Sequence, residues 1–319
     1  MQSRKDFIKS AALLGAGSLL IPNQAFSKTP DTTPVQTTSK WPDDTRLVIS
    51  ISMQFEAGGE PERGFDSPFP PNLKEGFTDL PAKTWFQYGY KEGIPRLLNL
   101  WDKYGIKVTS HTIGEAARHN PGLAREIVKR GHEIAGHGLN WTPQYTMSYE
   151  EEKKFIKASV DIIKEVTGQT TIGYNCNWLR RSKNTLAILQ ELGFTYHIDD
   201  LSRDEPFLIP VNGKNFAVVP YTLRCNDIQL LEGRYFSSKQ FGEQLRLEFD
   251  QLYEEGATRK RQMSISTHDR ISGSPAQVKA IDDFLAYATK QPGVRFMRKD
   301  EIARITLNDK TAIVDKDYF

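Results

Sequence analysis

The chain has few cysteines, little excess of charge of either sign and no nucleotide-binding signature. Cys176 and Cys225 are its two cysteines, and their spacing does not match a metal-binding motif. The 42 basic residues nearly balance the 40 acidic ones, so no basic surface for nucleic acid is expected. No G-x-G-x-x-G motif, phosphate loop or repeat of fixed period occurs. Nucleotide chemistry and nucleic-acid partners are therefore not expected.

The N-terminus has the order of a secretory signal. Arg4 and Lys5 precede the apolar run 11–21, which is too short to span a bilayer. We interpret residues 1–27 as a signal peptide that resembles a twin-arginine export signal, with lysine in place of the second arginine. The Thr- and Pro-rich residues 28–40 are a predicted linker. We expect an exported, periplasmic protein without a membrane span after processing.

Residues 41–319 alternate short apolar runs with longer segments of helical period, the pattern of repeated βα units around a parallel sheet. We predict one α/β domain, a distorted (β/α) barrel of seven or eight units, with an open doubly wound sheet as the alternative. In an oxidising compartment its two cysteines could pair, and the sequence leaves this open. The predicted strands are 47–55, 106–110, 133–138, 171–176, 195–199, 216–221, 263–267 and 294–297.

A long helix is predicted to begin at Ser148. Ser148 and Glu151 have the spacing of a capping box, in which each residue satisfies a free backbone N–H of the other. Gly168 stands where the helix should end. One face of this helix should pack against the sheet through Phe155, Ser159, Ile162, Ile163 and Val166.

Polar side chains stand where several predicted strands end. In a parallel βα barrel, catalytic groups lie at the C-terminal ends of the strands. Glu56 follows the first strand, and His137 and His268 end two later ones. A carboxylate and two imidazoles supply the base, the acid and the orienting group that hydrolysis needs. Arg180 follows a strand between them, so we predict that these four residues form a site.

Each of these residues alone has an ordinary structural explanation. A lone glutamate or histidine at a strand end is most often solvated or structural, and Arg180 could pair with a surface carboxylate. The combination of Glu56, His137 and His268 favours a catalytic site. We interpret the remaining histidines as structural, namely His111, His119, His132 and His197.

At these positions the chain resembles the polysaccharide deacetylase superfamily, over about 47–305. It is most similar to the allantoinase-type branch, which is described as metal-independent. Residues 54–60 (QFEAGGE) are similar to that branch's N-Y-E-E-G-G-E, and residues 137–141 (HGLNW) to its H-G-W-R-W. The resemblance extends to residues 87–90, 131–135, 179–185, 219–227 and 264–270.

The departures from the superfamily concern the metal. In its metal-dependent members, the second aspartate of the first motif and both histidines of the second bind the ion. Those positions are Ala57, His137 and Trp141 here. Because a catalytic zinc normally takes three protein ligands, the resemblance implies a site without metal or other cofactor. A rebuilt zinc site would need further ligands, for which the candidates are Asp66, Asp227 and Asp269.

By the same resemblance, Glu56 takes the position of the catalytic base and His268 that of the acid. We predict a hydrolase of carbon–nitrogen bonds other than peptide bonds, in which Glu56 activates water and His268 protonates the leaving nitrogen. His137 and Arg180 would bind the substrate and stabilise the oxyanion. Without metal activation, a cyclic ureide or imide is favoured over a plain acetamide. The other predicted substrate-binding residues are Trp141, Glu60 and Asn226.

Two alternatives stay open. Export favours a glycan over a ureide, so the chain could be an extracytoplasmic N- or O-deacetylase of polysaccharide with a relocated metal. It could also be a catalytically silent binding module in which Trp85, Trp141 and Trp178 stack on sugar rings, unless they only pack in the core. The retained acid–base pair argues against a silent protein. Relatives of this type are often tetramers, which leaves a homo-oligomer open.

Overall fold

The computed structural model describes residues 40–60, 68–69, 73–74 and 76–318. The predicted signal peptide and all but the last residue of the predicted linker lie outside this part. Within it, no helix has the length and apolar character needed to cross a bilayer. The described residues belong to one unit, Thr37–Phe319.

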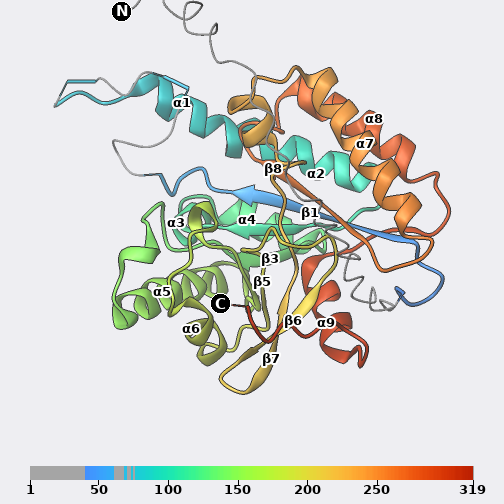
Figure 1. Ribbon diagram of the computed structural model, residues 1–319. Coiled ribbons are helices and arrows are strands. Elements are labelled where there is room, and N and C mark those ends of the chain that lie inside the picture. The colour runs from blue at the N-terminus through green and yellow to red at the C-terminus, as the bar shows by residue number, and fades with distance from the viewer. Residues whose placement is uncertain (1–39, 61–67, 70–72, 75, 319) are drawn as a thin grey trace, which may run out of the picture. The chain divides into compact units, whose positions relative to one another are not determined.

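Among these residues, a curved sheet of nine strands forms the centre of the fold (Figure 1). The strand order is β6-β7-β5-β4-β3-β2-β1-β8, with β9 paired to β1. Neighbouring strands are parallel, and only β6 and β7 are antiparallel. The strands are β1 (Leu47–Phe55), β2 (Thr109–Thr112), β3 (Glu133–Gly136), β4 (Gly173–Tyr174), β5 (Tyr196–His197), β6 (Phe207–Val211), β7 (Lys214–Val218), β8 (Gln262–His268) and β9 (Val294–Phe296).

Helices cover the outside of this sheet, with α7 and α8 side by side on one flank and α5 and α6 on another (Figure 1). Most parallel crossovers between strands therefore run through helical segments, as expected for a βα barrel, whereas β5 and β7 are connected through β6. The helices are α1 (Leu80–Tyr88), α2 (Ile94–Lys103), α3 (Gly114–His119), α4 (Pro121–Lys129), α5 (Tyr149–Thr167), α6 (Thr185–Glu191), α7 (Ser238–Glu255), α8 (Pro275–Ala288) and α9 (Lys299–Asn308).

Loop contacts join the two ends of the sheet. The Gln262 amide on β8 donates to the Asp204 carbonyl over 2.8 Å, and Ser264 Oγ donates to the Pro220 carbonyl over 2.6 Å. These bonds tie β8 to the segments that flank the β6–β7 hairpin. The expected distorted (β/α) barrel is confirmed.

The central strand β1 separates two kinds of side chain. It is buried along its whole length. Its odd-numbered residues belong to the main apolar core, which also contains Trp101 of α2 and Phe249 of α7. On its other face, Ser50 accepts a hydrogen bond from Lys299 Nζ, and Gln54 donates to Tyr221 Oη. Because side chains alternate along a strand, this polar face leads directly to Glu56.

All eight predicted strands are present; 47–55 matches β1 at both ends, and the other seven have shifted ends. The predicted strand 106–110 is β2, which begins three residues later, after the buried Ile106 and Val108. The sequence analysis missed β6. This strand contains the exposed Pro210, which breaks the apolar run, and a proline is tolerated there because β6 is at the edge of the sheet.

The predicted ends of the long helix are confirmed in α5. Ser148 Oγ accepts from the Glu151 amide, while the Glu151 carboxylate accepts from the Ser148 amide over 2.8 Å. Gly168 ends the helix in the left-handed conformation at φ 75°. Four of the five predicted packing residues are buried, and Val166 is half-buried against the main core.

Replacing Ser148 by alanine should therefore lower the free energy of unfolding by about 1 kcal/mol, since the Glu151 amide loses its side-chain partner. Urea denaturation measures this change. Ser274 is the matched control, because it precedes α8 without a side-chain capping bond. Equal losses in Ser148→Ala and Ser274→Ala would contradict the capping role.

Candidate active site

A cavity of about 330 Å³ lies among the loops that follow the strands. It is lined by Gln54 and Glu56 at the end of β1 and by His268 at the end of β8. All predicted site residues except Glu60 line it. This volume is in the range of small-molecule sites. Its lining residues include Gln54, Glu56, His137, Trp141, Asn175, Cys176, Trp178, Arg180, Tyr221, Asn226 and His268.

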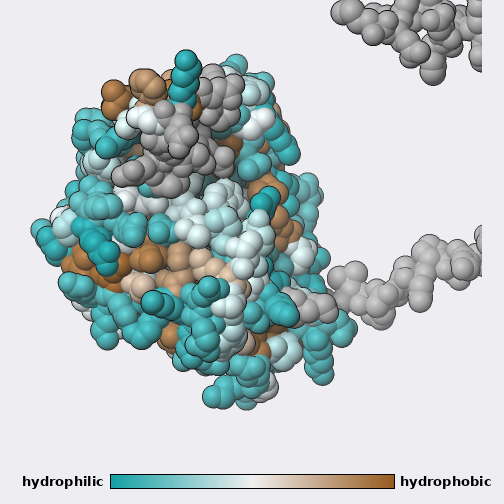
Figure 2. All heavy atoms as spheres, turned by 90° about the vertical axis from the view of Figure 1, so that its left-hand side faces the viewer, coloured by the Kyte–Doolittle hydropathy of each residue, from teal (hydrophilic) through white to brown (hydrophobic). Residues whose placement is uncertain are grey.

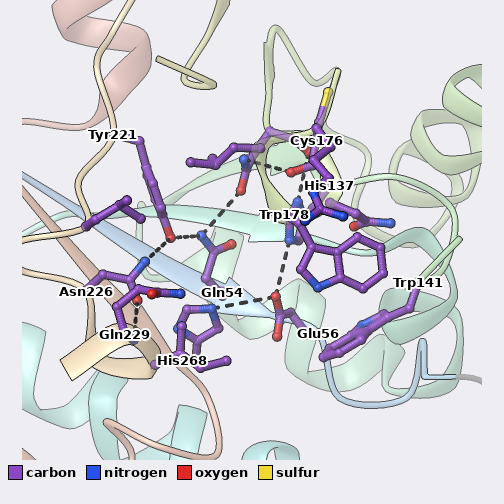
Figure 3. A pocket seen from close by; sticks show the side chains of 16 residues that line it. Gln54, Glu56, His137, Trp141, Cys176, Trp178, Tyr221, Asn226, Gln229 and His268 are labelled. Atoms are coloured by element: carbon purple, nitrogen blue, oxygen red, sulfur yellow. Dashed lines mark hydrogen bonds and ion pairs between the residues drawn. The ribbon is translucent and has the colours of Figure 1, made fainter. Parts of the chain in front are cut away.

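Glu56 lies between the imidazoles of His137 and His268 (Figure 3), and the Arg270 guanidinium pairs with its second oxygen. Its Oε1 is 3.3 Å from His137 Nε2 and 3.8 Å from His268 Nε2, and its Oε2 accepts from Arg270 Nη1 over 2.7 Å. Burial opposes ionisation, but the charges of His268 and Arg270 and the bond from His137 outweigh it. They hold the pKa of Glu56 far below its usual range. Glu56 is therefore a carboxylate at neutral pH.

Aromatic rings enclose the guanidinium that pairs with Glu56. Arg270 is 3% exposed, and its Cζ lies 4.7, 4.5 and 5.2 Å from the ring centroids of Trp85, Phe86 and Trp141. Its Nε and Nη2 have no hydrogen-bond partner among the described residues. Cation–π attraction to these rings and the ion pair with Glu56 are what stabilise this buried charge.

His268 is held by a second buried carboxylate. Asp227 Oδ1 accepts from His268 Nδ1 over 2.5 Å, and Asp227 Oδ2 accepts from the His268 amide and from Ser272 Oγ. Burial lowers the pKa of His268, but the charges of Asp227 and Glu56 raise it more, so the net shift is upward. His268 Nε2 lies 3.8 Å from Glu56 Oε1, and the residue lines the cavity.

His137 has its tautomer fixed by the backbone. Its Nδ1 lies 2.8 Å from the Asn175 carbonyl, which can only accept, so Nδ1 carries a proton. Its Nε2 lies 3.3 Å from Glu56 Oε1. Asp199 fixes Asn175 in turn, accepting from Asn175 Nδ2 over 2.7 Å. These contacts orient His137 with its Nε2 toward Glu56 and the cavity.

The other predicted binding residues take different places. Arg180 is exposed at the rim, and Trp141 stands edge-on to Trp178 at 6.2 Å. Asn226 is buried, with its Nδ2 3.4 Å from Tyr221 Oη. Glu60 does not line the cavity, and its carboxylate accepts from the Gly58 amide over 2.6 Å instead. The structure therefore brings six of the seven predicted residues together.

The loop after β1 is fixed from the side of β8. Asp269 Oδ2 accepts from the amides of Glu56 and Ala57 at 3.1 and 3.0 Å. A side chain at Gly89 would lie 2.6 Å from Asp269 Cγ, and one at Gly93 would lie 1.9 Å from the Asp269 carbonyl. Only glycine permits this close approach of the segment between α1 and α2.

The four histidines that we interpreted as structural do not line the cavity. His111 and His197 are fully buried, and burial, the largest influence, lowers the pKa of His111 well below its usual value and that of His197 to about 3. His132 accepts from the Val108 amide, and His119 contacts the Gly58 carbonyl. The two cysteines are both free thiols.

The described side chains do not fit a catalytic metal. No group of three or more histidine, cysteine, aspartate or glutamate side chains among them is arranged to hold an ion. Ala57 offers no donor atom, and Trp141 packs over Arg270. Asp227 and Asp269, proposed as replacement ligands, are engaged with His268 and with the β1 loop. Asp66 lies outside the described residues.

Comparisons with known proteins agree with this fold. The sequence profile of the polysaccharide deacetylase family matches residues 82–197. A Pseudomonas aeruginosa PAO1 structure described as a probable polysaccharide deacetylase is 31% identical, with a TM-score of 0.78 over 85% of this chain and 94% of that chain. The chain belongs to the polysaccharide deacetylase family.

Two further family relatives indicate the range of chemistry among similar proteins. The structure of PuuE allantoinase is also 31% identical, with a TM-score of 0.77, covering 83% of this chain and 91% of that chain. A Helicobacter pylori peptidoglycan deacetylase is 25% identical over 244 residues, which are 66% of this chain and 82% of the relative. The expected family is confirmed, and its members similar to this chain include both deacetylases and an allantoinase.

The sequence analysis missed two residues that set the charges of this site. Arg270 and Asp227 were not assigned a role in catalysis. Both stand in segments whose similarity to the allantoinase-type branch was noted, 264–270 and 219–227. That similarity was the available signal, but it does not reveal that Arg270 pairs with Glu56 and Asp227 with His268.

The Arg270–Glu56 pair should dominate the local energetics. Replacing Arg270 by leucine leaves a buried carboxylate without its cation and should lower the free energy of unfolding by about 3–5 kcal/mol. Because Glu56→Gln removes the same charge pair, the double variant should lose less than the sum of the two single variants, with a coupling on the order of 1–3 kcal/mol.

Urea denaturation of the four proteins measures this coupling. The surface pair Glu126→Gln and Arg130→Leu on α4 gives the matched control, and its coupling should be close to zero because the pair is solvated. Additive losses at Glu56 and Arg270 would contradict the assigned ion pair.

Proposed function

We propose that this family member hydrolyses a carbon–nitrogen bond of an acyl or cyclic amide, with Glu56 as general base and His268 as general acid. One observation carries the proposal. A carboxylate paired with Arg270 and an imidazole bonded to Asp227, which raises the imidazole's pKa, face each other in one cavity. An acid and a base with pKa values driven in opposite directions are the arrangement that general acid–base hydrolysis requires.

The reaction would proceed in two proton transfers. Glu56 Oε1 takes a proton from water as the hydroxide oxygen bonds to the substrate carbonyl carbon, which gives a tetrahedral intermediate. His268 Nε2 then gives its proton to the amide nitrogen as the carbon–nitrogen bond breaks. The Nδ1 proton remains on the ring, hydrogen-bonded to Asp227. His137 and Arg180, which line the cavity, would offset the negative charge on the carbonyl oxygen.

The lowered pKa of Glu56 bears on the choice of substrate. A carboxylate stabilised by Arg270 and two imidazoles is a weak base, so it removes a proton from water less readily than a free glutamate would. The described side chains do not form a ligand set for a metal that could activate the water instead. This supports an acyl group with an activated carbonyl, such as a cyclic ureide or imide.

A second candidate function, deacetylation of an exported glycan, is favoured by the mouth of the cavity. Trp178 is 44% exposed there, and its φ of 55° holds it in a conformation that is unfavourable for a bulky residue. An exposed indole beside a polar cavity suits stacking on a sugar ring. The N-terminal residues 1–27, which we propose act as a signal peptide, would carry such an enzyme to the periplasm.

Replacing Glu56 by glutamine should abolish turnover, with a fall in kcat of about 100-fold or more, because the amide keeps the shape and loses the base. Release of acetate from N-acetylated sugars and opening of hydantoin-type rings are the assays. The control is Glu254→Gln, an exposed carboxylate on α7, which should retain wild-type rates.

Full activity in Glu56→Gln would refute the assigned base. Metal analysis of the purified protein accompanies this assay, and activity should be unaffected by a chelator. Stoichiometric zinc together with chelator-sensitive acetate release would instead establish a deacetylase with a rebuilt metal site.

A further inference from the structure

The buried part of the catalytic cavity is a network of carboxamide and hydroxyl groups (Figure 3). We call it the polar floor, and it consists of the lining side chains Gln54, Asn175, Tyr221 and Asn226. Gln54 is paired with His268 in the register of β1 and β8. It also lies on the face of β1 that leads to Glu56. Gln54 is therefore next to both residues to which we assign proton transfer.

The mouth of the cavity has a different character. Two apolar residues of the lining, Trp178 and Leu223, are 44% and 39% exposed there. Figure 2, viewed from the side toward which β1 points, shows a band of hydrophobic residues between hydrophilic ones on this face. Because a few placed polar groups fix the orientation of a ligand in a pocket, we expect that role from the polar floor.

The orientation of the Asn175 carboxamide is fixed by its neighbours. Its Nδ2 donates to the Cys176 carbonyl over 3.1 Å and to Asp199 Oδ1 over 2.7 Å. Because a backbone carbonyl can only accept, the nitrogen of this carboxamide must be the atom that faces Cys176. Asn175 Oδ1 is therefore the atom that faces Gln54.

This orientation in turn identifies the two terminal atoms of Gln54. Gln54 Nε2 donates to Asn175 Oδ1 over 3.4 Å and to Tyr221 Oη over 2.9 Å. The opposite assignment would place two oxygen acceptors against each other. Gln54 Oε1 then has no hydrogen-bond partner among the described residues, although Gln54 is only 1% exposed. The carboxamide oxygen of Asn226, in contrast, accepts from the Gln229 amide.

A buried acceptor without a partner costs free energy, so its presence in a cavity wall indicates a ligand that donates to it. An amide substrate brings two kinds of polar group. Its carbonyl oxygen faces the donors that we assign to the oxyanion, and its N–H needs an acceptor. Glu56 Oε2 is engaged by Arg270, and Glu56 Oε1 is assigned to the water. Gln54 Oε1 supplies an acceptor on the side of His268, where the nitrogen leaves.

We propose that Gln54 is a specificity-determining residue whose Oε1 accepts a hydrogen bond from the N–H of the leaving nitrogen. The proposal rests on the carbon–nitrogen hydrolysis assigned to Glu56 and His268. The hydrogen bond orients the leaving nitrogen so that the lone pair released from the breaking bond faces His268 Nε2. An alkylated nitrogen or an ester oxygen has no proton for Oε1, so both are selected against.

Two methylated hydantoins test this assignment. Ring opening releases the nitrogen between the two carbonyl groups. 1-Methylhydantoin keeps the N–H on this nitrogen, whereas 3-methylhydantoin carries a methyl group in its place. The wild-type protein should show kcat/KM about 10-fold higher or more for 1-methylhydantoin, because leaving a buried acceptor unpaired costs about that factor. A wild-type ratio near one would overturn the proposal.

The variants distinguish the lost hydrogen bond from simple crowding by the methyl group. Gln54→Met removes the acceptor at similar volume, so the ratio should fall toward one. Tyr221→Phe breaks the bond from Gln54 Nε2 but leaves Oε1 in place, and it should keep the preference whatever its rate. A ratio that survives in Gln54→Met, or that is lost in Tyr221→Phe, would contradict the role of Oε1.

Ser52→Ala is the matched control. Ser52 lies on the same face of β1 and is fully buried, and its Oγ also has no partner among the described residues. It does not line the cavity, so this variant should keep the wild-type ratio. Loss of the preference in Ser52→Ala would show that any polar change inside the barrel has this effect, and it would overturn the assignment to Gln54.

Calorimetric binding separates this proposal from the catalytic one. Glu56→Gln should not turn over either isomer, and it should bind 1-methylhydantoin about 10-fold more tightly than 3-methylhydantoin. This preference without any turnover by the wild-type protein would keep the role of Gln54 and reject the assigned acid and base for such rings. Turnover of both isomers at equal rates would reject Gln54 and leave the catalytic assignment intact. Equal binding of the isomers, or binding of neither, would also overturn the proposal.

Discussion

The buried ion pair between Glu56 and Arg270 is the interaction on which the arrangement of the site depends. It neutralises a carboxylate that burial would otherwise protonate, and it leaves Oε1 facing both imidazoles. The guanidinium is itself kept in place by the aromatic rings of α1 and of the loop after β3. Removing either charge would change the protonation of the whole cavity, because all the charged groups lie within a few ångströms of Glu56.

The same interaction explains two departures from the metal-dependent members of the family. Trp141 occupies the position of a histidine in those proteins, and its ring packs against Arg270. Ala57 occupies the position of the second aspartate. It is fully buried, and its amide donates to Asp269. Positive charge next to Glu56 is thus supplied by a side chain that is always protonated. A guanidinium orients and stabilises the carboxylate, but it does not lower the pKa of a bound water as zinc does, which is why the substrate's own reactivity matters here.

The sequence was sufficient for much of the fold and for the side chains at the strand ends. Glu56, His137 and His268 could be predicted to converge because strand ends meet at one edge of a parallel barrel. The partners of Arg270 and Asp227 could not be assigned, because which charged group a side chain reaches depends on loop paths that have no periodicity. The same reason explains why the prediction for Glu60 was wrong. Glu60 follows β1 as expected, but its carboxylate accepts from the Gly58 amide and does not line the cavity. The hairpin strand β6 was not predicted, because Pro210 interrupts its apolar run.

The central claim is that a charged His268 faces an ionised Glu56, and the protonation of His268 tests it most directly. Nitrogen-15 NMR of histidine-labelled protein can follow all six imidazoles, with the His268 signal assigned by its absence in His268→Gln. The pKa of His268 should lie above the usual value of about 6.5, and Asp227→Asn should lower it. A wild-type His268 that is neutral at pH 6.5, or that does not respond to Asp227→Asn, would contradict the account.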